Sequence, residues 1–351
     1  MAVFTLGIVE ALAARPDVEA SAYALTWRGR GRLPGMLPPG VTPARGPMAA
    51  RPLRWAWQRS NHPAIELWTG AIDVVHGTNF VVPPARRAAR VVTIHDLTPM
   101  RYPHLAERAT LAYGGLIARA LQDGAWVHTP SVYVAAEVVE HFGAEPARVV
   151  AVHEGVPSLP AVDGDRPPVV DAGRYILTVG TVEPRKDHPG LVRAFDLLAD
   201  RDRDVRLVIA GPDGWGADAL AGAVADARHR DRVIRVGYVA DDQRARLLHA
   251  AAAFAFPSVY EGFGLPPLEA MVAGVPVVAT DAGALPEVLG DAALLVPAGD
   301  VEAFSDALGR ALDDAGTRSR LVHAGRARAA AYSWEACAAG LVDLYQRAAG
   351  A

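Results

Sequence analysis

The stretch 256-FPSVYEGFGLPPLEAM-271 decides the fold of the second half of this chain. An apolar run, Ala250 to Phe256, leads into it and predicts a buried strand. Behind a Pro-Pro pair, an apolar helix is expected over Leu268 to Ala273, since proline is tolerated in a first helical turn. Gly262 and Gly264 allow the backbone to approach a ligand closely. A strand, a glycine-rich loop and a helix in this order can bind phosphate, because free N–H groups at a helix start attract anions.

Two carboxylates bracket this loop. Glu261 stands at its entrance and Glu269 on the expected first helical turn, so they can accept hydrogen bonds from hydroxyl groups on two parts of one ligand. A lone GxG usually marks only a turn. Together with the paired Glu, the Pro pair and the strand-to-helix switch, the motif resembles the E-x7-E signature of the retaining glycosyltransferases of family 4, which have the GT-B fold. That resemblance predicts an α/β protein with two Rossmann-like doubly wound domains.

Length and composition describe an ordinary globular protein of about two domains. The chain has 351 residues, of which 51% are hydrophobic and 21% are charged. Its net charge of -4 gives no reason to expect nucleic acid as a partner. The single cysteine, Cys337, excludes an intrachain disulfide and fits a reducing compartment. Because neither a signal peptide nor an apolar run of about 18 residues is visible, we expect a cytoplasmic protein.

The first half opens on an expected helix. Residues 2–15 predict that helix and residues 20–27 a strand. The opening helix resembles the first helix of the family, whose sheet usually begins with a strand and a glycine loop. We therefore expect the first strand of the N-terminal domain to be missing; a short strand over residues 3–9 is the alternative. Further strands are expected over 72–76, 91–94, 125–129 and 149–152, and helices over 111–121 and 131–142, with Ser131 as an N-cap.

The segment 27–59 is rich in Arg, Gly, Pro and Trp. Residues 1–110 carry 13 Arg against seven acidic side chains, on a chain that is acidic overall. Such a segment suits an anionic membrane surface or a phosphate-linked lipid acceptor, which would place the protein peripherally on the inner membrane face. The alternative is a solvated Arg-rich loop whose Trp55 and Trp57 pack into the domain.

One histidine follows an expected strand of the first half. His95 stands at the carboxyl end of the strand over 91–94, the edge of an open α/β sheet at which ligands bind. An isolated histidine is more often structural. The surrounding HDLTPMRYP, however, resembles the family motif in which this histidine reaches the transferred sugar, so the resemblance implies that role for His95.

The second half repeats the α/β alternation after a linker at 158–174, which is rich in Pro, Gly and Asp. We expect an N-terminal, acceptor-side domain over 1–160 and a C-terminal, donor-binding domain over 161–332. The helix 333–351 resembles the family's C-terminal helix, which crosses back onto the first domain. Strands of the second half are expected over 175–179, 205–210, 233–236, 250–256, 275–279 and 293–296.

Lysine occurs once among the 35 basic side chains, at Lys186 in the stretch 180-GTVEPRK-186. Arg185 and Lys186 come just after the expected strand 175–179, so they share a sheet edge with the glycine-rich loop. A nucleotide-sugar diphosphate carries two negative charges that become more localised as the glycosidic bond breaks. Two cations at this edge would stabilise that leaving group more in the transition state than in the ground state.

The resemblance implies a role for each matching position. The catalytic set is Glu261, His95, Lys186 and Arg185, with Glu261 holding hydroxyl groups of the transferred sugar. Glu269 would accept hydrogen bonds from the ribose diol, and backbone atoms of 237–239 would meet the base. The donor-binding set is Gly180, Thr181, Arg185, Lys186, Gly237, Tyr238, Val239, Gly262, Phe263, Gly264, Leu265 and Glu269. Many relatives have Arg where Thr181 stands, and Asp187 replaces the Asn of the GTxEPRKN subset.

These observations lead to one expected function and two alternatives. We expect a retaining glycosyltransferase that needs no metal and no cofactor, since no DxD element stands at a strand end and no His/Cys cluster has zinc-like spacing. Its donor would be a nucleotide-diphosphate hexose, with GDP-mannose favoured by the GTxEPRKN subset, and its acceptor a glycan, a lipid-linked acceptor or a small molecule. The alternatives are a sugar-nucleotide epimerase or hydrolase, and a nucleotide-sugar-binding protein that is inactive because its N-terminal glycine loop is absent.

Overall fold

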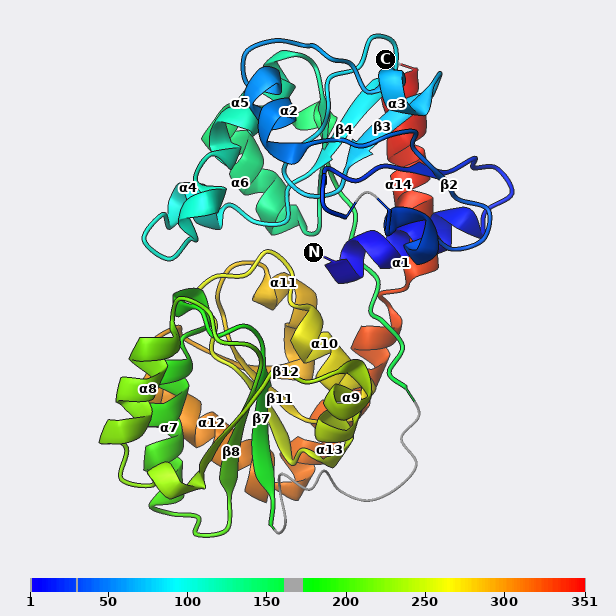
Figure 1. The fold of residues 1–351 in the computed structure, drawn as a ribbon. Helices are drawn as coiled ribbons and strands as arrows, with labels where there is room; N and C mark the ends of the chain where they lie inside the picture. Colours follow the sequence, from blue (N-terminus) through cyan, green and yellow to red (C-terminus); the bar gives the residue numbers. More distant parts are fainter. Residues whose placement is uncertain (1, 30, 161–172, 351) are drawn as a thin grey trace. The chain divides into compact units, whose positions relative to one another are not determined.

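The computed structural model describes residues 2–29, 31–160 and 173–350, and they form two compact units (Figure 1). Unit 1 comprises Met1–Pro103, Arg108–Gly155 and Tyr332–Ala351, and unit 2 comprises His104–Glu107 and Val156–Ala331. Each unit is built around its own parallel sheet. The larger part of the expected linker, residues 161–172, lies outside the described residues.

Unit 2 contains a six-stranded sheet with the order β12-β11-β10-β7-β8-β9, in which all neighbouring strands are parallel. The chain fills one side of the sheet first and then returns to the centre to fill the other. The strand order therefore reverses between β7 and β10, which pair directly. The strands are β7 (Tyr175–Val179), β8 (Arg206–Ala210), β9 (Val233–Gly237), β10 (Ala253–Phe256), β11 (Val277–Thr280) and β12 (Ala293–Val296).

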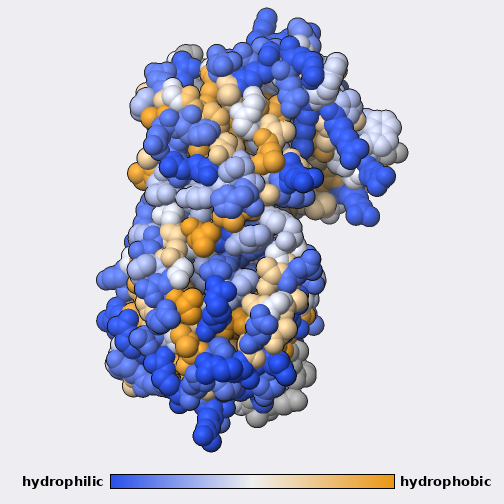
Figure 2. Space-filling model, turned by 90° about the vertical axis from the view of Figure 1, so that its left-hand side faces the viewer, coloured by the Kyte–Doolittle hydropathy of each residue, from blue (hydrophilic) through white to orange (hydrophobic). Residues whose placement is uncertain are grey.

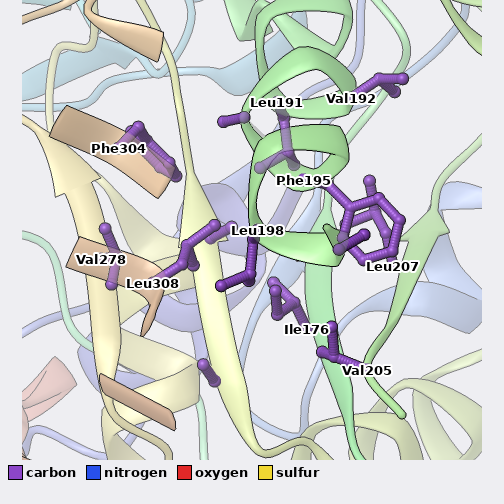
Figure 3. Packing of buried hydrophobic residues seen from close by; sticks show 14 of the residues in the cluster. Ile176, Leu191, Val192, Phe195, Leu198, Val205, Leu207, Val278, Phe304 and Leu308 are labelled. Atoms are coloured by element: carbon purple, nitrogen blue, oxygen red, sulfur yellow. The ribbon is translucent and has the colours of Figure 1, made fainter. Parts of the chain in front are cut away.

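Helices cover both faces of this sheet, as a doubly wound fold requires. On one face, Phe195 and Leu198 of α7 and Phe304 and Leu308 of α12 pack with side chains of the sheet such as Ile176 (Figure 3). On the other face α10 packs on α13 and on β10 and β11. The helices of unit 2 are α7 (His188–Ala199), α8 (Ala217–Asp226), α9 (Asp241–Ala250), α10 (Leu265–Val272), α11 (Leu285–Leu289), α12 (Val301–Asp313) and α13 (Ala315–Ala330).

Two expected boundaries around the glycine-rich loop were wrong. The strand expected over 250–256 begins only at Ala253, because Ala250 still ends α9 and contributes to the same apolar run. The helix expected from Leu268 begins at Leu265 and contains both prolines in its first turn. Proline fits there because its φ is already helical and its missing N–H would have had no partner within the helix.

Unit 1 contains a four-stranded parallel sheet with the order β3-β4-β5-β6. Its strands are β3 (Val74–Gly77), β4 (Ala89–Thr93), β5 (Trp126–Thr129) and β6 (Val149–Ala151). α1 (Ala2–Ala13) and α14 (Trp334–Ala349) pack on one face, where Phe4 and Leu341 belong to one buried cluster. The opposite face is covered by α2 (Ala50–Trp57), α5 (Tyr113–Gln122) and α6 (Val132–Phe142), and two short helices are α3 (Glu66–Thr69) and α4 (Thr98–Arg101).

The opening of the chain is a helix, α1, so the alternative of a strand over residues 3–9 was wrong. The strand expected over 20–27 is reduced to β1 (Ser21–Ala22), which pairs with β2 (Thr42–Pro43) in a separate two-stranded sheet. Ser131 caps α6 as expected, because its side chain accepts a hydrogen bond from Val134 N at 3.2 Å.

The two tryptophans of α2 differ in environment. Trp57 is buried and donates from Nε1 to the carbonyl of Pro63, whereas Trp55 is 61% exposed beneath the guanidinium of Arg59. The alternative in which both pack into the domain is therefore correct for Trp57 only. The face of the molecule in Figure 2 is mostly hydrophilic, with hydrophobic side chains scattered in small groups. Within the described ranges, no helix is long and apolar enough to cross a bilayer.

Candidate active site

The two motifs singled out in the sequence meet at one point of unit 2. The loop after β7 carries Arg185 and Lys186, and the loop after β10 carries Glu261. Because β7 and β10 are paired parallel strands, both loops leave the same edge of the sheet at the point where the strand order reverses. In open α/β sheets this is the place at which ligands bind. The backbone joins the loops directly, since Val259 N donates to the carbonyl of Arg185 at 2.9 Å.

At this point two cations share one carboxylate. Oε1 of Glu261 lies 2.6 Å from Nζ of Lys186, and Oε2 lies 2.6 Å from Nη1 of Arg185. Nη2 of Arg185 also contacts Glu183 at 2.6 Å, and Nζ of Lys186 lies 4.4 Å from the centre of the Phe256 ring. The side chains of Arg185, Lys186 and Glu261 are 15%, 12% and 9% exposed, so they form a largely buried charged cluster.

Burial and the neighbouring charges shift the pKa values of Glu261 and Lys186 in opposite directions. Burial alone would raise the pKa of Glu261, but Arg185 and Lys186 outweigh it and hold the pKa at about 2. Burial lowers the pKa of Lys186, and Glu261 counteracts that shift. The carboxylate is therefore ionised throughout the physiological range, and a pair of cations is held at the sheet edge.

The second carboxylate of the motif has a partner that the sequence did not indicate. Glu269, on the first turns of α10, is 2% exposed and contacts Arg244 of α9 through both carboxylate oxygens. Burial raises the pKa of Glu269, and Arg244 counteracts the shift. Arg244 was missed because it lies in an ordinary charged helix, 25 residues before its partner.

The backbone of the glycine-rich loop is shaped by two glycines. Gly264 has a φ of +124° and directly precedes α10. Gly283, which the sequence analysis also missed, has a φ of +61°, and a Cβ there would lie 2.3 Å from the carbonyl oxygen of Glu261. Because Pro266 and Pro267 have no N–H, the donors at this helix start come from the residues up to Leu265.

The other donor-site candidates of unit 2 lie along the same sheet edge. Gly180 follows β7 and lies beside the Lys186 side chain, where a Cβ would meet Cε at 3.6 Å. Thr181 comes next and precedes an isolated bridge between Val182 and Asp213. Gly237 ends β9, the edge strand two positions from β7, and Tyr238 beyond it is 76% exposed.

His95 belongs to unit 1, two residues beyond the end of β4. Its Nε2 lies 2.9 Å from the carbonyl oxygen of Thr78, and its Nδ1 lies 3.1 Å from Oε1 of the buried Glu154. Each ring nitrogen of His95 thus lies within hydrogen-bond distance of an oxygen atom of its own unit. The ring is thereby fixed in orientation within its own unit.

A second set of polar groups in unit 1, buried or partly buried, also escaped the sequence analysis. Tyr345 Oη lies 2.6 Å from Nδ1 of His76, Nε2 of His76 lies 2.7 Å from Oγ1 of Thr93, and this oxygen lies 2.9 Å from Nδ1 of His128. This relay of hydrogen bonds ends at the carbonyl of Val152, which lies 2.9 Å from Nε2 of His128. That carbonyl can only accept, so Nε2 of His128 donates to it. With both histidines neutral, every group in the relay donates in the same direction. Burial lowers the pKa of His128 to about 4, and that of His76 well below its usual value.

No group of three or more His, Cys, Asp or Glu side chains suited to a metal ion occurs among the described residues. The sequence contains a DxD-like stretch in a charged loop, Asp202-Arg203-Asp204, in which Asp202 pairs with Arg174 at 2.6 Å and accepts from Asp204 N at 3.0 Å. The carbonyl of Asp202 also accepts from Nη1 of Arg232 at 2.8 Å, so the contacts of Asp202 hold the loop that follows α7 in place.

Comparisons with known proteins place both halves of the chain in one family. Residues 1–158 match the model of "Glycosyltransferase Family 4", and residues 166–328 match "Glycosyl transferases group 1". The O-antigen chain mannosyltransferase B of Escherichia coli is 33% identical over 282 residues, covering 78% of this chain and 74% of that protein. The MMP alpha-(1->4)-mannosyltransferase of Mycolicibacterium hassiacum is 38% identical over 156 residues, covering 43% of this chain and 37% of that protein.

Solved structures share the fold at low identity. WaaG, a glycosyltransferase involved in lipopolysaccharide biosynthesis, has a TM-score of 0.69 at 18% identity, with 98% of this chain and 94% of that chain covered. Anabaena HepE has a TM-score of 0.69 at 15% identity, with 97% and 94% covered. The two Rossmann-like units are those of a GT-B glycosyltransferase. This chain belongs to glycosyltransferase family 4.

Proposed function

We propose that this glycosyltransferase transfers a hexose from a nucleotide-diphosphate sugar with retention of the anomeric configuration and without a metal ion. The observation that carries the proposal is the cluster of Arg185, Lys186 and Glu261 at the switch point of unit 2. Two cations within reach of one another suit a diphosphate, whose charge becomes localised as the glycosidic bond breaks. They supply the positive charge that a divalent cation provides in other transferases, which supports metal independence.

The proposed roles follow from position. Lys186 presents a compact ammonium and Arg185 a fork of donors, both suited to phosphate oxygens. Glu261 holds the two cations in place before the donor binds and, in the complex, accepts hydrogen bonds from hydroxyl groups of the transferred sugar. The main chain of Gly262 to Leu265 assists at the diphosphate, Glu269 accepts from the ribose diol, and backbone atoms of 237–239 meet the base.

In the proposed mechanism, the diphosphate leaves from the same face of the sugar at which the acceptor hydroxyl attacks. The bond between the anomeric carbon and the diphosphate oxygen breaks, that oxygen takes the proton of the acceptor hydroxyl, and the new glycosidic bond forms on the same face. Atoms and charge balance, because the nucleoside diphosphate leaves with the proton. The family resemblance supports a contact of His95 with the transferred sugar. The carboxylate of Glu154 and the carbonyl of Thr78 hold the ring in one orientation.

GDP-mannose is the proposed donor. The stretch 180-GTVEPRK-186 belongs to a subset resembling mannosyltransferases, and the Escherichia coli and Mycolicibacterium relatives both carry mannosyltransferase in their names. HepE was solved with UDP and glucose, so UDP-glucose is the competing donor. The acceptor is proposed to be a glycan, a lipid-linked acceptor or a small molecule.

A panel of GDP-, UDP- and ADP-sugars tests the proposal. Thermal shift should show stabilisation by one nucleotide class, in EDTA as well as in magnesium. Nuclear magnetic resonance of the product from that donor should show the same anomeric configuration as in the donor. Inversion of configuration, strict dependence on a divalent cation, or no binding of any of the three classes would each contradict the corresponding part of the proposal.

We further propose that unit 1 contacts an anionic membrane surface through the Arg/Trp-rich segment 27–59. Trp27, Met36 and Trp55 in this segment are 57%, 60% and 61% exposed, and Arg51 beside Trp55 is exposed as well. Sedimentation with vesicles containing phosphatidylglycerol should recover the wild-type protein, and the double variant Trp27→Ala/Trp55→Ala should bind several-fold less. Trp215→Ala, which removes an exposed tryptophan of unit 2, is the control. Equal sedimentation of all three proteins would argue against this contact.

A further inference from the structure

Arg244 holds the carboxylate of Glu269 symmetrically. Its Nη1 lies 2.7 Å from Oε1 and 2.6 Å from Oε2, so one nitrogen is shared between both oxygens. The two side chains come from the neighbouring helices α9 and α10 (Figure 1). Glu269 is almost completely buried and the side chain of Arg244 is 19% exposed. The contact therefore fixes both the position and the plane of a buried carboxylate.

This geometry leaves acceptor capacity on Glu269. An ionised carboxylate offers about two lone-pair sites on each oxygen. Arg244 uses one on each, so one site on each oxygen remains for a ligand. Two acceptors held side by side match two adjacent hydroxyl groups, as in the 2′,3′-diol of a ribose.

The guanidinium of Arg244 is itself incompletely satisfied. Its Nη2 lies 3.3 Å from Oδ1 of Asp241, whose carboxylate is 86% exposed. Its Nε is buried, and no acceptor within the described part of the chain lies within hydrogen-bond distance of it. A buried N–H without a partner is unfavourable, so this group favours a ligand that brings an oxygen atom.

We propose that Arg244 is the positioning residue of the ribose subsite: it keeps Glu269 in the ionised, acceptor-only state and orients its two free lone-pair sites toward the diol. The inference rests on the proposed nucleotide-sugar donor and deepens it, because it assigns a residue that no motif of the chain contains. Arg244 contacts Glu269 and not the reacting atoms, so it acts on donor affinity through that carboxylate.

The charges around Glu269 determine how the subsite should respond to pH. Burial raises the pKa of Glu269, Arg244 lowers it, and Asp241 raises it. From α13, which also packs on α10, Arg326 lies against Gly274, beyond the far end of α10. Removing Arg244 therefore raises the pKa of Glu269 further. Since the ionised form binds the diol, the affinity of such a variant should fall as the pH decreases through that raised pKa, at a higher pH than in the wild type.

Calorimetry on the full chain tests the inference. The probes are whichever of GDP, UDP and ADP binds the wild type, and its 2′,3′-dideoxy counterpart. Loss of the diol should weaken binding to the wild type by about 10-fold or more, as expected for hydrogen bonds to a charged group. Arg244→Leu should reduce this discrimination to less than about 3-fold, and its affinity for the full nucleotide should begin to fall at a higher pH than that of the wild type. Adding Glu269→Gln to that variant should remove the part of the pH dependence that Arg244→Leu introduces.

Two further variants keep the test decisive. Arg246→Leu removes an exposed arginine of the same helix and should behave as the wild type. Arg244→Lys retains a cation but cannot hold both oxygens in the same way, so it should keep the pH profile flat while reducing discrimination; it replaces Arg244→Leu if that variant does not fold. Full discrimination in both Arg244 variants would overturn the inference. Absence of nucleotide binding by the wild type would instead overturn the proposed function.

Discussion

Nζ of Lys186 lies 2.6 Å from Oε1 of Glu261, although 75 residues separate the two in the chain. The contact joins the loops that follow two paired strands, β7 and β10, and it places the single lysine of the protein at the switch point of the sheet. In the proposed function, this mostly buried ammonium stabilises the negative charge of the departing diphosphate.

Replacing Lys186 with Met should reduce the rate of transfer by about 100- to 1,000-fold, because a charge that stabilises the leaving group is lost while the length of the side chain is kept. Steady-state kinetics with saturating donor measure this effect as a change in kcat. Arg193→Met, which removes an exposed cation of α7, should leave kcat unchanged. A kcat for Lys186→Met within threefold of the wild type would contradict the assigned role.

The free energy of unfolding should depend on Glu261 at acidic pH. The folded-state pKa is about 2 against an ordinary value of 4.5, so the stabilisation is complete above about pH 4.5 and is lost as the pH falls toward 2. The difference corresponds to about 3 kcal/mol. Urea denaturation of the wild type and of Glu261→Gln between pH 2 and pH 6 checks this. A Gln variant with the same pH slope as the wild type would show that another group is responsible.

The relay of His76, Thr93 and His128 predicts a second acid sensitivity, at higher pH. Both histidines are neutral in the fold, so their stabilisation is complete above about pH 6.5 and decreases as the pH falls, for His128 down to its folded pKa of about 4. Thr93→Val leaves two ring nitrogens without a partner and should destabilise the protein by about 2 kcal/mol or more. Chemical denaturation followed at pH 7.5 measures the loss. Thr42→Val, at an exposed threonine of unit 1, should have little effect.

Asp187 occupies a left-handed backbone position, with a φ of +40°, and caps α7 by accepting from Gly190 N at 3.0 Å. Burial raises the pKa of its carboxyl group. Asp187→Asn should keep the stability or increase it, since Asn caps helices equally well and tolerates this backbone conformation without a buried charge. Asp187→Ala should cost about 1–2 kcal/mol. Thermal unfolding of the two variants distinguishes them; a more stable Ala variant would be the contrary result.

The sequence predicted those parts of the fold in which local pattern and tertiary environment agree. β7 and β12 have the expected bounds because each is a short apolar run flanked by turn residues. The strand before the glycine-rich loop was set too early, because the last turn of α9 is as apolar as the strand that follows it. The strand over 20–27 was expected to be long, yet only Ser21–Ala22 finds a partner strand.

The candidate site likewise contains residues that the sequence could place and residues that it could not. Arg185, Lys186 and Glu261 could be placed together because each follows an expected parallel strand, and such strands end at one edge. Arg244 could not be found in this way, since a helical arginine among other charged residues carries no signal of its contact. The relay in unit 1 joins residues up to 269 positions apart through single hydrogen bonds, and neither periodicity nor spacing in a sequence reveals such pairs.

The reversal of strand order between β7 and β10 also has a mechanical consequence. All three charged groups of the cluster lie in loops that follow adjacent strands of one sheet within unit 2, and the hydrogen bond from Val259 N to the carbonyl of Arg185 joins these loops. A rigid-body movement of either unit leaves these distances unchanged. A change in the relative position of the units therefore requires no rearrangement of the Arg185–Lys186–Glu261 cluster.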